Sequence, residues 1–125
     1  MSAQVLVVED NEKNMKLFRD VLAATGFRTL EATTGEQAVE LASEHAPDLI
    51  LMDIQLPDFD GIEALRRLRA DEQTASLPVL ALTAQAMEGD RERFLAAGFD
   101  GYLSKPVNVA DFVATVKRYC APGVR

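Results

Sequence analysis

The sequence predicts a doubly wound α/β fold, in which five parallel strands are covered by helices on both faces. Three observations lead to this prediction. Short apolar runs alternate with segments of helical period along the whole chain. The runs are apolar throughout, as expected of strands that are buried on both faces of a parallel sheet. Strict alternation of strands and helices favours parallel strands joined by helical crossovers.

The expected strands correspond to five apolar runs. Each run is short and is bounded by polar or turn residues, which is typical of a strand in a sheet interior. The expected strands are residues 5–8, 28–32, 49–52, 79–82 and 101–103.

Cap and stop residues bound the expected helices. Asn11 begins the first helix, and Gly26 ends it. Thr34 and Gln37 form a capping-box pattern that opens the second helix, which must end before Pro47. The inner stripe of the first helix is expected to consist of Leu17, Phe18, Val21 and Leu22.

Three further helices follow in the second half of the chain. Apolar residues recur at helical period after Gly61. A helix over residues 90–97 ends at Gly98, and Asn108 caps the last helix. The inward residues of the last helix are expected to be Val109, Phe112, Val113, Val116 and Cys120.

Length and composition restrict the function of the chain. Its 125 residues fit one domain, 1–125, without a following output domain, and can bury a core without a disulfide or structural metal. The net charge of −7 argues against non-specific nucleic-acid binding, and Arg66, Arg67 and Arg69 are interpreted as a solvated helix face. No apolar run is long enough to span a membrane, and the single Cys120 cannot form an internal disulfide, which together favour the cytoplasm.

Polar residues follow the apolar runs at four strand ends. They are Glu9-Asp10, Asp53, Thr83 and Lys105. The carboxyl ends of parallel strands share one edge of the sheet, where the functional crevice of such folds lies. We therefore expect three carboxylates, one hydroxyl and one ammonium group in one cleft.

This set of groups suits phosphoryl transfer. Two unit charges about 4 Å apart repel by roughly 4 kcal/mol at an effective dielectric of 20, so neighbouring carboxylates favour a bound cation. Mg²⁺ binds through one or two carboxylates and leaves room for phosphate oxygens. Asp53 is the expected nucleophile, since a carboxylate can form an aspartyl phosphate. Lys105 and Thr83 would stabilise the charge on the phosphoryl oxygens.

Five short motifs recur in order along the chain: Val8-Glu9-Asp10-Asn11, Leu51 to Pro57, Asp60-Gly61, Leu82-Thr83-Ala84 and Tyr102 to Pro106. As a set they resemble the response-regulator receiver domains of two-component signalling, over the whole chain. The resemblance implies a flavodoxin-like (βα)5 sheet with strand order 2-1-3-4-5. Within the family, the first fifty-seven residues look most similar to a single-domain regulator of cell division.

The resemblance also implies roles for individual residues. Asp10, Asp53 and the backbone carbonyl of Gln55 would bind Mg²⁺, or Mn²⁺ in its place. Glu9 would act through a metal-bound water or as a ligand. The peptide bond between Lys105 and Pro106 would be cis.

The implied switch connects the phosphoryl group to a protein surface. Thr83 would turn toward the phosphoryl group and Tyr102 would follow, which remodels the surface of the fourth helix, fifth strand and fifth helix for a partner protein. Gln55 and Gln85 would tune the lifetime of the phosphorylated state. The donor would be a phosphohistidine of a kinase or phosphotransfer protein, and the chain would act as a self-phosphorylating switch rather than a turnover enzyme.

Three other functions match part of the pattern. A phosphohydrolase of the haloacid-dehalogenase family would have a second aspartate where Gln55 stands. A flavin- or nucleotide-binding protein would have a glycine- or hydroxyl-rich loop in place of the acidic residues after the first strand. A degenerate receiver would only scaffold partners, although every position needed for chemistry is filled.

Each residue taken alone also has a simpler interpretation. Asp53 by itself suits a turn or a helix cap, Lys105 the surface, and Tyr102 ordinary packing. Asn14 and Met15 are interpreted as helix surface, either solvated or in contact with a kinase near the mouth of the cleft. Only the set of residues at one sheet edge favours the phosphoryl site.

Overall fold

The computed structural model describes residues 3–84 and 90–120. Five parallel strands form one sheet in the order β2-β1-β3-β4-β5, which confirms the expected fold class and strand order. The strands are β1 (Gln4–Val8), β2 (Arg28–Ala32), β3 (Leu49–Asp53), β4 (Val79–Thr83) and β5 (Gly101–Ser104).

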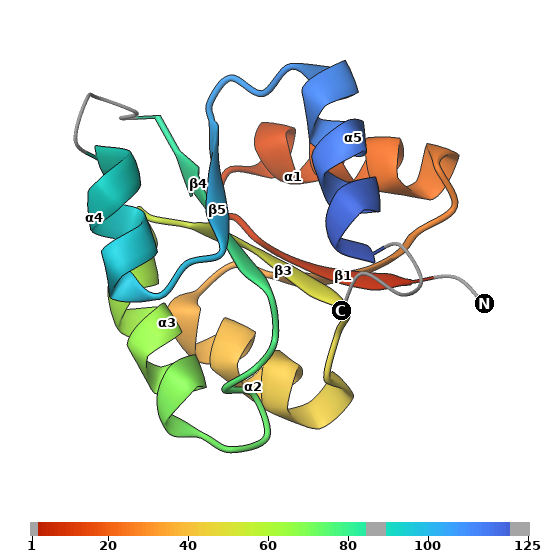
Figure 1. Ribbon diagram of the computed structural model, residues 1–125. Helices are drawn as coiled ribbons and strands as arrows, with labels where there is room; N and C mark the ends of the chain where they lie inside the picture. The colour runs from red at the N-terminus through yellow and green to blue at the C-terminus, as the bar shows by residue number, and fades with distance from the viewer. Residues whose placement is uncertain (1–2, 85–89, 121–125) are drawn as a thin grey trace.

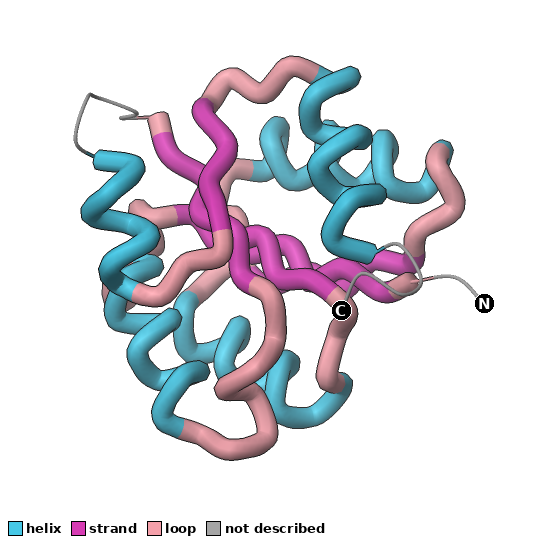
Figure 2. The backbone as a smooth tube through the Cα atoms, viewed as in Figure 1, coloured by secondary structure: helices cyan, strands magenta, loops and turns pink. Residues whose placement is uncertain are grey.

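A helix follows each strand, and the helices cover both faces of the sheet. Figure 1 shows α1 and α5 on one face and α2, α3 and α4 on the other, and the strands form a single twisted layer between them in Figure 2. The helices are α1 (Glu12–Ala24), α2 (Gly35–His45), α3 (Gly61–Ala70), α4 (Asp90–Ala97) and α5 (Val109–Cys120). In the part of the chain that the structure describes, no helix combines the length and apolar character needed to span a bilayer.

Successive strand residues point to opposite faces and divide the core into two clusters. In β1, Leu6 and Val8 belong to the cluster under α2, α3 and α4, whereas Val5 and Val7 belong to the cluster under α1 and α5. Strands β3 and β4 alternate in the same way. This double burial explains why the sequence shows continuous apolar runs rather than alternation with polar residues.

The expected caps are present at the helix ends. Asn11 Oδ1 accepts a hydrogen bond from the backbone N–H of Asn14 at 3.1 Å, and Thr34 Oγ1 accepts one from Gln37 at 3.1 Å. Gln37 Oε1 in turn accepts from the N–H of Thr33 at 2.8 Å, one residue earlier than in a regular capping box. Gly98 ends α4 with a φ of 113°, in the left-handed region that glycine adopts most readily.

Four assignments of inward and outward residues were wrong. Leu17 is 39% exposed, whereas Met15 is buried beside Phe18. Val109 in α5 is 47% exposed, because the helix directs Phe112 and Val116 inward. Arg69 is not part of a solvated face: its guanidinium donates to the backbone carbonyls of residues 75, 77 and 98.

Candidate functional site

The carboxyl ends of the central strands meet at one edge of the sheet. The register pairs Val8 with Met52, so β1 and β3 end side by side. Asp53, the last residue of β3, pairs with Leu82, and Thr83 ends the adjacent β4. The sequence places its polar residues at these ends, and the parallel register brings them to one site.

Lys105 lies at the centre of this site. Its Nζ is 3.0 Å from Asp53 Oδ2 and 2.5 Å from Glu9 Oε1. The backbone N–H of Lys105 donates to the carbonyl of Thr83 at 2.8 Å, and the peptide bond to Pro106 is cis. The ammonium group therefore connects residues from the ends of β1 and β3, and its backbone is attached to the end of β4.

Two groups orient the carboxylate of Asp53. Oδ2 accepts from Lys105 Nζ, and Oδ1 accepts from the backbone N–H of Gln55 at 3.1 Å. The residue is only 5% exposed. Behind it, Gly61 packs so closely that an added Cβ would lie 2.5 Å from the Asp53 carbonyl oxygen. The side chain is thus buried, hydrogen-bonded at both oxygens and backed by a close contact between two segments of backbone.

Three carboxylates at this site can offer ligands to one cation. Glu9, Asp10 and Asp53 each place an oxygen so that the three atoms lie within 4.8 Å of one another. Asp10 is exposed, whereas Glu9 is 1% exposed. Glu9 Oε1 forms an ion pair with Lys105 Nζ but no further hydrogen bond among the described residues. A buried carboxylate oxygen with room for a further partner and an all-oxygen ligand set both suit Mg²⁺.

The charges at the site shift each other's protonation. Burial raises the pKa of Glu9 above its ordinary value, the Lys105 ammonium lowers it by less, and the nearby Asp53 charge adds to the increase. Burial lowers the pKa of Lys105, but its contacts with Glu9 and Asp53 raise it by more, so the ammonium stays charged. On balance the pKa of Glu9 is raised, because the Lys105 ammonium offsets only part of the effect of burial, and a cation bound beside Glu9 would lower it.

A small cavity of about 50 Å³ opens beside Asp53. Thr83, which is buried, lines it together with Lys105, so the three predicted chemical groups share one space. Ala84 is exposed at its mouth. The cavity is bounded by Asp53, Ile54, Gln55, Thr83, Ala84, Arg93 and Lys105.

Arg93 is a member of this site that the sequence did not indicate. It belongs to α4, and side chains on a helix lean toward the N-terminal end, which here faces the cavity. Its guanidinium also lies over the Phe94 ring, 5.0 Å from the centroid. No spacing or neighbouring motif distinguishes this arginine from those on other helices.

The remaining predicted residues lie around the site at different distances. Tyr102 is half-buried in β5, and its ring centroid is 6.4 Å from that of Phe94 in α4. Gln55 supplies the N–H bound to Asp53, as described above. Gln85 lies outside the described residues.

The family of the chain is shown by its similarity to known proteins. The sequence model of the response regulator receiver domain matches residues 5–117. The chain belongs to the receiver domain family. As a receiver domain it is a component of two-component signalling, and the resemblance found in the sequence is confirmed.

Among curated proteins, this receiver domain is similar to polar-differentiation response regulators named DivK. Those of Brucella ovis and Brucella anthropi are each 50% identical to it over 119 residues, which cover 95% of this chain and 97% of the relative. The similarity therefore extends over nearly the full length of both proteins.

Solved structures show the same fold with direct information on the site. The receiver domain of the sensor histidine kinase PA1611 from Pseudomonas aeruginosa, described with a magnesium ion in its active-site cleft, is 39% identical (TM-score 0.88; 96% of this chain and 98% of that one). The complex of the Saccharomyces cerevisiae phosphotransfer protein Ypd1 with the receiver domain of Ssk1 also matches, at 29% identity (TM-score 0.88; 99% and 92%). One receiver domain of this fold has thus been solved with a metal ion, and another with a phosphotransfer partner.

Proposed function

We propose that this receiver domain is a phosphorylation switch in which Asp53 accepts a phosphoryl group from a phosphohistidine in a Mg²⁺-dependent reaction. The observation that carries the proposal is the contact of Lys105 Nζ with both Asp53 and Glu9, at the edge of a cavity that Thr83 also lines. Residues from four strand ends are thereby arranged around one buried carboxylate oxygen.

The proposed reaction is a displacement at phosphorus. An oxygen of Asp53 forms a bond to phosphorus while the bond from phosphorus to the histidine nitrogen breaks, and its electron pair returns to the imidazole. Lys105 moves its contact from the carboxylate to the phosphoryl oxygens, and the Thr83 hydroxyl donates to them. Positive charge at these oxygens is the main contribution that the chain can make to phosphoryl transfer.

The site residues also account for metal dependence. Asp10 and Asp53 would bind Mg²⁺ with the Gln55 backbone carbonyl, and Glu9 would act as a ligand or through a bound water, with Mn²⁺ as a substitute. When bound, the ion supplies positive charge beside the phosphoryl oxygens and reduces repulsion among the carboxylates. The magnesium ion in the cleft of the similar PA1611 receiver domain supports this assignment.

The signal would leave through protein contacts. We infer that Thr83 turns toward the phosphoryl group and that Tyr102, half-buried against Phe94, follows it and alters the surface formed by α4, β5 and α5. Gln55 and Gln85 would set the lifetime of the phosphorylated state. Residues 1–125 would act as one receiver domain that switches rather than turns over small substrates.

The relatives suggest the partners. The Ypd1–Ssk1 complex supports a histidine phosphotransfer protein or a histidine kinase as the donor. The DivK relatives support a role in polar differentiation and cell division. The net charge of −7 supports protein partners rather than nucleic acid. We also infer a cytoplasmic location.

Labelling of Asp53 tests the proposed function. The purified protein is incubated with Mg²⁺ and acetyl phosphate in one experiment, and with Mg²⁺ and a phosphorylated histidine kinase in a separate one. Each product is analysed by intact-mass and peptide mass spectrometry. We expect a hydroxylamine-sensitive phosphoryl adduct on Asp53 that does not form when EDTA is present from the start. Asp53→Asn keeps the size of the side chain and should lose acceptance completely.

Three results would contradict the proposal. An adduct of equal yield in Asp53→Asn would place acceptance at another residue. No adduct in the wild-type protein with either donor would leave a scaffolding function, and multiple turnover of phosphate monoesters would favour the phosphohydrolase.

A further inference from the structure

The loop between β3 and α3, residues 54–60, is attached at both of its ends. At its start, the Gln55 N–H donates to Asp53 Oδ1 at 3.1 Å. At its end, Asp60 Oδ1 caps α3 by accepting from the N–H of Glu63 at 2.8 Å, and Gly61 N–H donates to the carbonyl of Ile54 at 2.8 Å. The loop therefore closes on itself directly behind the proposed phosphoacceptor.

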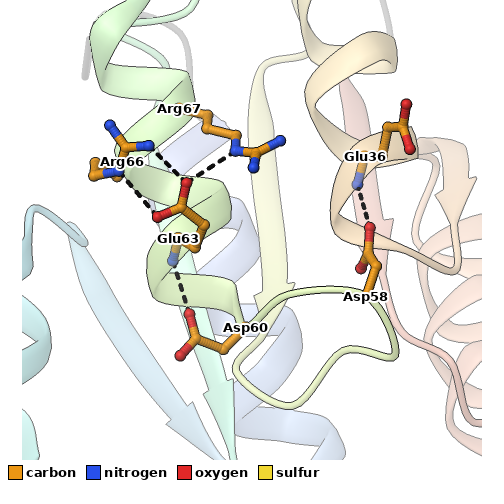
Figure 3. A network of polar contacts seen from close by, with 6 residues as sticks. All are labelled: Glu36, Asp58, Asp60, Glu63, Arg66 and Arg67. Atoms are coloured by element: carbon orange, nitrogen blue, oxygen red, sulfur yellow. Dashed lines mark hydrogen bonds and ion pairs between the residues drawn. The ribbon is translucent and has the colours of Figure 1, made fainter.

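Asp58 provides a third attachment, which reaches a different helix. Its Oδ1 accepts from the N–H of Gly35 at 2.8 Å and its Oδ2 from the N–H of Glu36 at 3.0 Å, so both oxygens bind the first turn of α2. Figure 3 shows Asp58 extending from the loop to α2, while Asp60 of the same loop faces α3. Thr34 binds only the third N–H of this turn, so Asp58 satisfies donors that the helix itself leaves without partners.

The neighbouring residue fits the same junction. Phe59 lies so close to Gly35 that an added Cβ would be 2.4 Å from its ring. The Arg67 guanidinium of α3 lies on the ring, 4.1 Å from the centroid. The loop is thus packed between the start of α2 and the exposed face of α3.

Only two residues separate Asp58 from Gln55. They are Leu56 and Pro57, and Leu56 packs against the core. Proline fixes its own φ and restricts the residue before it, so this link has little conformational freedom. A contact that holds Asp58 therefore also restricts the Gln55 backbone.

We propose that Asp58 is a positioning residue of the phosphoacceptor site: by joining the loop to the first turn of α2, it holds the Gln55 backbone against the Asp53 carboxylate. The inference rests on the proposed function, because the same Gln55 backbone would supply the carbonyl ligand for Mg²⁺. The N–H donors of Gly35 and Glu36 fit this role. Burial raises the pKa of Asp58, but backbone N–H donors, with those of Gly35 and Glu36 first among them, together lower it by more, so the side chain is ionised at neutral pH.

Three variants separate positioning from charge and from stability. Asp58→Ala removes both acceptors, and Asp58→Asn keeps one of the two. Glu36→Gln removes one negative charge at the adjacent position but retains the backbone N–H that Asp58 binds. For each protein, Mg²⁺ affinity is measured by isothermal titration calorimetry, acceptance from acetyl phosphate by mass spectrometry, and Tm by circular dichroism.

We expect Asp58→Ala to weaken Mg²⁺ binding and slow acceptance by about tenfold each, at the lower end of the effects seen for side chains that orient metal ligands. Asp58→Asn should have an intermediate effect, and it also serves as the test if Asp58→Ala does not fold. Glu36→Gln should match the wild type. The Gly35 and Glu36 amide resonances should shift in the Asp58 variants.

Unchanged Mg²⁺ affinity and acceptance in the folded Asp58 variants, with a reduced Tm, would overturn the inference, because the contact would then only stabilise the fold. Equal effects in Glu36→Gln would also overturn it and assign the effect to charge. Failure of the wild-type protein to bind Mg²⁺ or accept phosphoryl groups would instead refute the proposed function itself.

Discussion

At the scale of single residues, Lys105 neutralises two buried carboxylates at once. Glu9 and Asp53 are 1% and 5% exposed, and both contact the same ammonium group. Removing one partner of a buried ion pair leaves a charge without compensation, which costs more than the pair contributes. The unphosphorylated form of the site therefore depends on Lys105 for its stability, in addition to the role in chemistry that we propose for this residue.

The first prediction concerns Lys105→Ala. Without Mg²⁺ we expect the free energy of unfolding to fall by about 2 kcal/mol at neutral pH, less than a fully buried pair would lose, because the site opens to solvent on one side. The measurement is urea denaturation followed by circular dichroism. Asp53→Asn in the same background should restore part of the loss, since it removes one of the two charges.

The pH dependence of this variant has a definite sign. A carboxyl group whose pKa is raised on folding destabilises the folded state once it ionises. For Glu9 this destabilisation grows as the pH rises from the ordinary pKa of 4.5 toward the higher pKa of the folded state. Without Lys105 the pKa of Glu9 rises further. The fall in the free energy of unfolding caused by Lys105→Ala should therefore be larger near neutral pH than at about pH 5. An equal loss at both pH values would show that Glu9 is not the residue left uncompensated.

At the scale of secondary-structure elements, α3 carries a three-residue ion-pair network. Glu63 binds Arg66 at 2.7 Å and Arg67 at 2.9 Å (Figure 3). Hydrogen bonds from Arg66 and then Arg67 lower the pKa of Glu63 to about 2, against a small opposing effect of burial. The lowered pKa means that this carboxylate stabilises the fold only while it is ionised.

The second prediction follows for Glu63→Gln. The stabilisation by Glu63 is fully present at pH values above the ordinary pKa of 4.5, and it is lost as the pH falls through the folded-state pKa of about 2. We expect the variant to have a lower Tm than the wild type at neutral pH, with the difference shrinking below about pH 4.5 and at high salt. A difference in Tm that does not change with pH would contradict the network.

The third prediction compares two residues of α5. Phe112 stacks on Phe18 of α1 with ring centroids 5.2 Å apart, and it is fully buried. Phe112→Ala should therefore reduce the free energy of unfolding by about 3–5 kcal/mol. Val109→Ala on the same helix should change it by less than about 0.5 kcal/mol, because Val109 is 47% exposed. Urea denaturation measures both, and similar losses would mean that α5 packs through a different face.

The faces of the helices show what the sequence could and could not predict. The apolar residues of α1 are compatible with two buried faces, one that includes Leu17 and one that includes Met15, both together with Phe18. Only the position of the helix on the sheet decides that Met15 is buried and Leu17 is exposed. Arg69 gave no signal, because the carbonyls that bind it belong to irregular segments, at residues 75, 77 and 98, whose path the sequence pattern does not reveal. Asp58 was missed for the same reason, since its partners lie twenty-two and twenty-three residues earlier.

The site itself was more predictable than these packing details. Apolar runs that stop at Glu9, Asp53, Thr83 and Lys105 place those residues at strand ends, and parallel topology brings strand ends together. The alternation of elements thus predicted the convergence without any knowledge of side-chain contacts. Arg93 could not be found in this way, because it reaches the cavity from a helix rather than from a strand end.

At the scale of the whole molecule, metal binding should be linked to stability. A ligand that binds only the folded state stabilises it, by about 2.7 kcal/mol at a concentration one hundred times its Kd. The fourth prediction is that Mg²⁺ raises the Tm of the wild-type protein and that Asp10→Ala removes this increase. Asp10 is exposed, so its replacement should leave the metal-free Tm nearly unchanged.

A control is needed because the chain has a net charge of −7, and any salt reduces its internal repulsion. The comparison is therefore made against NaCl at the same ionic strength. An equal increase in Tm for Asp10→Ala in Mg²⁺ would show that the effect is general screening and not binding at this site.

The strand order gives Asp53 a central position in the molecule. It ends β3, the middle strand, with β1 and β2 on one side and β4 and β5 on the other. A charge added there is equally near the two halves of the protein, so the sheet alone gives no direction to the signal. Under the proposed function, the direction must come from asymmetry around the sheet: the loop after β3 holds Asp53 through the Gln55 N–H, whereas Thr83 and Tyr102, the residues proposed to respond, belong to β4 and β5.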